Sequence, residues 1–308
     1  MQSTLIRRFL SAAGKIIGYL LAVVLLGALL APPFYWLGQA CSQISALHFL
    51  KGTDFQRYFA RSILISAFLL LPLVIRSIGL ERFRDMGLRR NPLWWRDVIA
   101  GLLLAVAVTA ALGFVAIQFG IYTWKSPLPW NLVAAVFLPA LTVSVIEEFL
   151  FRGAILGLVR QTISTVPAIV LVSALFSIIH FFRPVDGQIS SVQWYSGFEL
   201  IGKGFGRLTD PLLVGGGFMT IFVLGLLLAD SVVRTRSLWL SIGLHAGTVF
   251  GKMSFNKLTK QLTQAPPWFG PELTVGLGSV LTLLFLWLLV WLLFLHRAFS
   301  PRTFSNDH

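Results

Sequence analysis

The sequence is poor in charge. Asp, Glu, Lys and Arg together make up 12% of the 308 residues, whereas soluble domains carry about 25%. Hydrophobic residues make up 56%, against roughly 45–50% in a soluble domain. So few charges cannot cover a water-facing surface of ordinary polarity, which excludes a soluble enzyme, a disordered protein and a fibrous repeat. The composition therefore predicts a membrane protein with several spans.

Cysteine and acidic residues are also scarce. Cys41 is the single cysteine, so the chain has no intramolecular disulfide framework. Twelve acidic residues stand against 25 basic ones, which gives a net charge of +13. In a soluble protein such an excess would suggest nucleic-acid binding. Because the basic residues fall between apolar runs, we assign them to loops beside anionic lipid and expect no nucleic-acid partner.

Long apolar runs recur along the chain. A helix needs about 20 apolar residues to cross a bilayer, and the strands of outer-membrane barrels alternate instead. The predicted fold class is all-α, a polytopic membrane protein of about eight transmembrane helices in a single integral membrane domain over residues 1–308. The predicted spans are residues 16–37, 62–80, 98–122, 132–159, 166–182, 212–230, 237–250 and 273–296.

The distribution of Lys and Arg predicts the topology. If both termini are cytoplasmic, the cytoplasmic segments hold more Lys and Arg than the others, and residues 76–96 form the most basic loop. Arg7, Arg8 and Lys15 precede the first apolar run, as in a signal peptide. This run is longer than the core of a typical signal peptide, so we interpret it as an uncleaved span.

Two acidic residues lie inside an apolar run. Ten of the twelve acids fall in loops, tails or span ends, whereas Glu147 and Glu148 lie within residues 133–151. An intramembrane acid costs on the order of 2.5–3.5 kcal/mol on the insertion scale, so such residues are functional-site candidates by default. Arg152 follows Glu148 by four residues, and we expect these two to form an ion pair. Glu147 points about 100° away on a helix, so this pair does not account for it.

Two histidines also fall in predicted spans. His180 lies in residues 166–182 and His245 in residues 237–250. A single intramembrane histidine is commonly an interhelical hydrogen-bond partner. Helix tilts averaging about 20° would nevertheless allow both imidazoles to meet the two carboxylates in one cavity. Gly243 and Gly247 flank His245 in a small-xxx-small pattern, which favours close helix approach.

Carboxylates and imidazoles together can hydrolyse an amide bond. A carboxylate can act as a general base toward water, one imidazole can orient that water, and a second can donate to the developing oxyanion. No Gly-x-Ser-Gly, His-Glu-x-x-His or Gly-x-Gly-Asp motif occurs, which argues against other common intramembrane protease types. A proton-coupled transporter is an alternative, because Glu and His can relay protons. Transporters usually show internal repeats, and this sequence shows none.

The motifs resemble those of a known family. Glu147-Glu148-Phe-Leu-Phe-Arg152 resembles the Glu-Glu-x-x-x-Arg motif of the type II CAAX prenyl protease and bacteriocin-processing family (CPBP, also called Abi). Phe176-Ser-Ile-Ile-His180 resembles its Phe-x-x-x-His motif, and residues 237–245 resemble the run that leads to its third motif. The resemblance covers residues 132–250, the expected catalytic core. It implies an eight-helix intramembrane endopeptidase that opens toward the cytosol.

The resemblance also implies residue roles. In the family the first Glu and the first His activate water, and the second His stabilises the oxyanion with an Asn four residues later. Val249 occupies that Asn position here, and Thr248 beside it is the candidate substitute. This departure leaves a non-catalytic protein of the same fold, such as a bacteriocin-immunity or partner-binding protein, as an alternative. The implied catalytic residues are Glu147, Glu148, His180 and His245.

Cofactor and partners follow from the same resemblance. The family is often classed with metalloproteases, and Glu147, His180 and His245 could bind zinc. A glutamate can activate water without a metal, and we expect no required cofactor. The expected partners are the lipid bilayer and a membrane-embedded or lipidated peptide or protein substrate. The expected location is the bacterial inner membrane, with both termini cytoplasmic.

Overall fold

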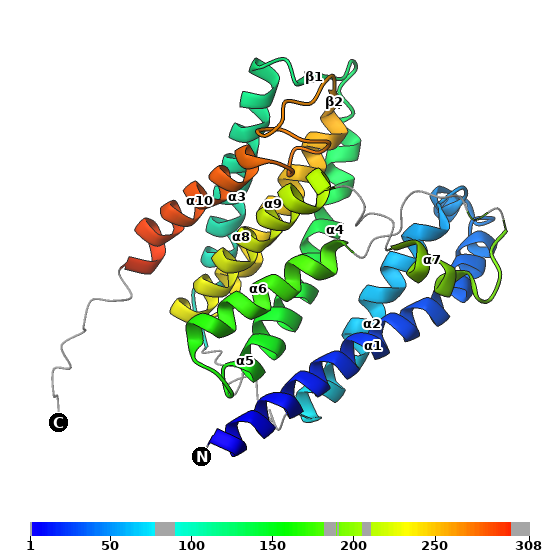
Figure 1. Cartoon of the computed structure of the whole chain (residues 1–308). Coiled ribbons are helices and arrows are strands. Elements are labelled where there is room, and N and C mark those ends of the chain that lie inside the picture. Colours follow the sequence, from blue (N-terminus) through cyan, green and yellow to red (C-terminus); the bar gives the residue numbers. More distant parts are fainter. Residues whose placement is uncertain (1, 78–89, 182–188, 190, 205–210, 297–308) are drawn as a thin grey trace. The chain divides into compact units, whose positions relative to one another are not determined.

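The computed structural model describes residues 2–77, 90–181, 189, 191–204 and 211–296. These residues are almost entirely helical (Figure 1), which confirms the all-α prediction. The longer helices are α1 (Gln2–Cys41), α2 (Phe55–Ser77), α3 (Trp94–Gln118), α4 (Trp130–Glu148), α6 (Thr165–Phe181), α8 (Pro211–Thr235), α9 (Trp239–Leu258) and α10 (Leu277–Val290). The shorter elements are η1 (Ser45–Leu50), η3 (Phe149–Ile155), α5 (Leu156–Val159), α7 (Ser196–Gly204), η5 (Trp291–Leu295) and the paired strands β1 (Tyr122–Trp124) and β2 (Thr259–Gln261).

Within the described residues, six helices are long and apolar enough to cross a membrane. They are Ala13–Cys41, Phe55–Ser77, Trp94–Gln118, Trp130–Val159, Val214–Thr235 and Leu277–Leu295. The predicted span 166–182 forms the shorter apolar helix α6, and the predicted span 237–250 forms part of α9, whose second half carries Lys252 and Lys257. The polytopic prediction is therefore confirmed, while the count of eight stays a prediction. Arg82, Arg84 and Arg89 of the basic loop lie outside the described residues.

The chain divides into two compact units. Unit 1 comprises Met1–Met86 and Ile146–Ile221, and unit 2 comprises Gly87–Val145 and Phe222–His308. The units interleave in sequence, because α4 passes from unit 2 into unit 1 and α8 passes back. The expected catalytic core, residues 132–250, contributes to both units.

In unit 1, α1 and α2 form an antiparallel pair (Figure 1). Lys15 Nζ donates a hydrogen bond to the Ser77 carbonyl (2.6 Å), and the Tyr19 hydroxyl donates to the Ala67 carbonyl (2.7 Å). These contacts bring the first part of α1 beside the end of α2, as expected if residues 1–15 and 76–96 share one side of the membrane. Their cytoplasmic orientation stays a prediction.

The short helix α7 packs on α1. Gly197 lies directly against the main chain of Ala28, so a side chain at residue 197 would collide with that backbone. Leu200 of α7 is buried in a cluster with Ala28 and Ala31 of α1 and Phe55 of α2. A helix of nine residues is too short to be stable alone, so α7 depends on this packing.

In unit 2, α3 and α9 pack backbone against backbone. A Cβ atom at Gly243 would meet the Val98 carbonyl, and one at Gly247 would meet the Leu102 carbonyl. Gly101 of α3 contributes in the same way, because its Cβ position lies 2.8 Å from the Leu244 nitrogen. Helices surrounded by lipid associate mainly through such close van der Waals contact. The predicted close approach around His245 is confirmed.

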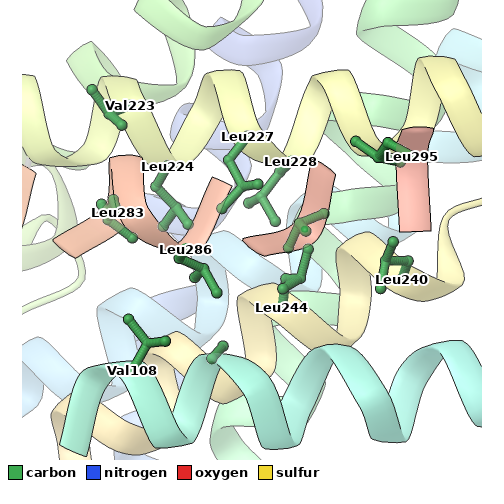
Figure 2. Packing of buried hydrophobic residues seen from close by; sticks show 12 residues of the cluster. Val108, Val223, Leu224, Leu227, Leu228, Leu240, Leu244, Leu283, Leu286 and Leu295 are labelled. Atoms are coloured by element: carbon green, nitrogen blue, oxygen red, sulfur yellow. The ribbon is translucent and has the colours of Figure 1, made fainter. Parts of the chain in front are cut away.

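The core of unit 2 is aliphatic. Figure 2 shows leucines of α8, α9 and α10 in one cluster with Val108 of α3. Large apolar side chains such as Leu103, Leu281 and Phe285 are exposed on the outer faces of the same helices. A helical bundle embedded in lipid is apolar inside and outside, because lipid surrounds it and each helix satisfies its own backbone hydrogen bonds.

Candidate active site

The two predicted carboxylates end a long helix. Glu147 and Glu148 are the last residues of α4, which continues without interruption into the π-helical segment η3. π-Helical turns are rare and occur frequently at functional sites. Residues Leu150 to Ile155 of η3 are buried, including Arg152. The sequence therefore carries both carboxylates and a cation into the interior of unit 1.

Glu148 and Arg152 form the predicted ion pair. Arg152 Nη1 lies 2.9 Å from Glu148 Oε1, and the two side chains are 1% and 0% exposed. Withdrawing two charges from water is expensive, and the pair persists because each charge compensates the other. The i,i+4 prediction is confirmed, and the pairing makes Glu148 part of the internal support of unit 1.

Glu147 faces His180 instead. The Nε2 atom of His180 lies 3.6 Å from Oε2 of Glu147, and these side chains are 17% and 16% exposed. His180 lies in the last turn of α6, next to the helix end. The predicted divergence of the two carboxylates is thus realised, since Glu147 turns toward an accessible imidazole while Glu148 turns inward.

The other ring nitrogen of His180 defines its tautomer. Nδ1 lies 2.7 Å from the Phe176 carbonyl oxygen. A carbonyl can only accept, so Nδ1 carries the proton in the neutral imidazole and Nε2 presents a lone pair. Two acceptors, Nε2 and the carboxylate of Glu147, then face each other at a separation longer than a hydrogen bond. This arrangement suits a donor such as a water molecule that approaches from the side and donates to both acceptors, because 3.6 Å leaves no room for an atom directly between them.

Phe176 links the two pairs. Its ring is fully buried. The guanidinium carbon of Arg152 lies 4.2 Å from the ring centroid, and the His180 ring centroid lies 4.4 Å away at 60°. Phe151 packs edge-on against the same ring at 5.0 Å. Sequence reasoning noted Phe176 only as part of a motif, and its spacing of four residues from His180 was the available signal.

His245 and Thr248 belong to unit 2. His245 is 2% exposed on α9, between the two glycines that approach α3. The hydroxyl of Thr248 donates to the Leu244 carbonyl one turn earlier (2.9 Å). Its single proton would have to leave that bond to reach an oxyanion. The expected meeting of His245 and Thr248 with Glu147 stays a prediction.

The donors of unit 1 bear on the zinc alternative. Glu147 and His180 bring two ligand atoms face to face. Catalytic zinc sites keep three protein ligands and one open position. Among the described residues of unit 1, no group of three or more His, Cys, Asp or Glu side chains is arranged to hold a metal ion. The described part of unit 1 thus shows two such ligands rather than three, and a cofactor-free reaction stays a prediction.

Comparison with known proteins identifies a related family. Residues 129–251 match the family described as Type II CAAX prenyl endopeptidase Rce1-like. No curated protein and no solved structure matches the chain. The matched stretch agrees with the expected core, residues 132–250, and contains all four residues with an implied catalytic role. The resemblance inferred from the motifs is confirmed: residues 129–251 of this polytopic membrane protein are similar to the type II CAAX prenyl endopeptidase (CPBP) family.

Proposed function

We propose that the protein is an intramembrane endopeptidase in which Glu147, assisted by His180, activates water to hydrolyse a peptide bond. Its family match supports a membrane protease in general. The finer proposal depends on one observation, the facing of Glu147 Oε2 and His180 Nε2 at 3.6 Å between two side chains that are each partly exposed. The substrate class that we propose is a membrane-associated or lipidated peptide or protein.

The proposed reaction begins with a water molecule that donates to both acceptors. As its oxygen attacks the scissile carbonyl carbon, Glu147 takes the proton and a C–O bond forms. The carbonyl oxygen carries the negative charge in the tetrahedral intermediate. When this collapses, the C–N bond breaks and the proton passes to the leaving nitrogen. One water is consumed, and a carboxylic acid and an amine are released.

His180 and Glu148 support this step differently. With its proton on Nδ1, His180 uses the Nε2 lone pair to orient the water and to share its proton. Glu148 is engaged with Arg152 and buried, so we assign it to positioning rather than to proton transfer. We assign the oxyanion donor to His245, the role that the family resemblance implies, with Thr248 as a second donor.

Cleavage of a peptide library tests the proposal. The purified protein in liposomes is mixed with membrane-anchored peptides, half of them carrying an S-prenylated Cys-a-a-X end, and products are identified by mass spectrometry. We expect cleavage by the wild type and none by Glu147→Gln. Glu199→Gln is the matched control, because Glu199 is an exposed glutamate of α7 in the same unit and should retain the wild-type rate. An inactive wild type would favour the non-catalytic alternative.

A further inference from the structure

Phe176 contacts one member of each of two pairs in unit 1, Arg152 of the Glu148–Arg152 pair and His180 of the Glu147–His180 pair. The guanidinium of Arg152 lies over its ring, and the imidazole of His180 packs against the same ring at 60°. Its main-chain carbonyl accepts from His180 Nδ1. A series of contacts therefore links Glu148 to Arg152, Arg152 to Phe176 and Phe176 to His180. His180 in turn faces Glu147, which is the neighbour of Glu148 in the sequence.

The ring and the carbonyl of Phe176 constrain different properties of His180. The carbonyl fixes which nitrogen carries the proton, provided that the imidazole keeps its present rotation. The ring supports one side of the imidazole and so restricts that rotation. A two-fold rotation about χ2 would move Nδ1 away from the carbonyl and turn a carbon toward Glu147 in place of Nε2. A half-buried imidazole needs such support to keep one orientation.

The buried Glu148–Arg152 ion pair holds the ring of Phe176 in place. Arg152 cannot move away from Glu148 without leaving a carboxylate uncompensated in the interior, so its guanidinium forms a fixed surface. A cation over an aromatic face is attractive, and more so when both are shielded from water. The ring of Phe176 is thus held on one side by Arg152 and is in contact with His180.

We propose that Phe176 is the positioning residue that holds His180 as the Nδ1–H tautomer with Nε2 directed at Glu147. This inference rests on the proposed function of the same site. It assigns a purpose to a costly buried ion pair next to the reactive carboxylate: the pair fixes the ring that orients the imidazole. Phe176 touches neither water nor substrate in this account, and it acts only through His180.

Nitrogen NMR of the purified protein tests this directly. The protein is labelled with ¹⁵N-histidine and measured in detergent micelles at alkaline pH, where imidazoles are neutral. His180→Gln identifies the signals of His180, since the chain has five histidines. Nitrogen shifts distinguish the two tautomers. We expect a single Nδ1–H form in the wild type and in Phe176→Tyr, and a mixture of tautomers in Phe176→Leu.

Phe151→Leu is the matched control. It removes a buried ring that contacts Phe176 and lies 5.9 Å from the Arg152 guanidinium, and it should leave the His180 signals unchanged. An Nε2–H form in the wild type would overturn the proposal without any variant. So would a wild-type signature in Phe176→Leu, or loss of the signature in Phe151→Leu alone.

Activity supplies a second readout. With an S-farnesylated Cys-a-a-X peptide as the probe, Phe176→Leu should lower kcat about 10²-fold, the cost of a small misplacement of a reacting group. KM should be unchanged, and Phe176→Tyr should restore most of kcat. If the wild type does not cleave this probe, the proposed function fails for that substrate while the tautomer measurement still decides the role of Phe176. An unchanged kcat in Phe176→Leu would overturn the positioning role of Phe176.

Discussion

Glu147 and Glu148 are neighbours in sequence but lie in opposite surroundings. Glu148 is fully buried and 2.9 Å from Arg152, whereas Glu147 is partly accessible and 3.6 Å from His180. Both side chains belong to the last turn of α4. The difference follows from the helix itself, because residues one apart diverge by about 100°. Glu148 is thereby paired in the interior, while Glu147 keeps part of its side chain exposed.

A third pair extends the comparison to unit 2. Asp230 and Arg234 have the same i,i+4 spacing as Glu148 and Arg152, but their side chains are 12% and 31% exposed. The indole nitrogen of Trp287 also donates to Asp230 (3.0 Å), which ties α10 to α8. Equal spacing therefore coexists with unequal burial. Burial, rather than spacing, determines how much each pair contributes to stability.

The largest expected effect is on catalysis. Glu147→Gln keeps the shape of the side chain and removes the base, so cleavage should be abolished, with the rate lowered at least about 10²–10⁴-fold. Its melting temperature in detergent should match that of the wild type, and binding of an uncleaved substrate should be retained. Rates from single-turnover cleavage and affinities from peptide titration check both expectations. A variant that loses binding as well would show that Glu147 contributes to substrate recognition.

Arg152→Ala should have the largest effect on stability. It leaves Glu148 buried without its cation, which typically costs about 3–5 kcal/mol. Thermal unfolding in detergent should show a clear fall in melting temperature, accompanied by lower folded yield and lost cleavage. A double variant, Glu148→Gln with Arg152→Met, removes both charges and should regain much of the stability. If Arg152→Ala melts like the wild type, the supporting role of the pair is wrong.

Packing of unit 2 should show an intermediate effect. Gly243→Ala places a methyl group against the Val98 backbone, and overpacking of this kind costs about 1–3 kcal/mol. Gly18→Ala on α1 is the control, because a Cβ there meets no atom within 4 Å. We expect Gly18→Ala to be neutral or slightly stabilising. Equal melting temperatures for the two variants would contradict the close α3–α9 contact.

The smallest effect should come from Arg234→Ala. The pair that it breaks is partly exposed, and Trp287 still donates to Asp230. A cost on the order of 1 kcal/mol or less is expected. Thermal unfolding beside Arg152→Ala compares two Arg→Ala changes in pairs of equal spacing. A loss in Arg234→Ala as large as in Arg152→Ala would overturn the view that burial sets the difference.

Local sequence features predicted part of this site. Helical geometry alone gave the Glu148–Arg152 pair and the divergence of Glu147, because both depend on residues within one turn. The glycines around His245 predicted close approach by another helix, and the structure shows that this helix is α3. The apolar runs predicted the helices. The number of membrane spans could not be fixed, because α6 is short and α9 is partly polar.

Contacts between distant segments were beyond the sequence. The pairing of Glu147 with His180 joins residues 33 positions apart, and the stacking of Arg152 on Phe176 joins η3 with α6. The π-helical geometry of η3 could not be predicted, because its apolar sequence would fit an α-helix equally well. These contacts form only when the helices pack. The residue types in the sequence therefore indicated which chemistry is possible, but not which residues meet.

The most direct test of the account measures cleavage and metal content on the same samples. Wild type, Glu147→Gln and His180→Ala are purified, exhaustively chelated, analysed for zinc and assayed in liposomes. The account predicts a wild-type rate that chelation leaves unchanged, zinc well below one per chain, and no cleavage by Glu147→Gln. About one zinc per wild-type chain, lost in both variants, together with a rate that chelation abolishes and zinc restores, would contradict the proposal that Glu147 and His180 activate water without a metal.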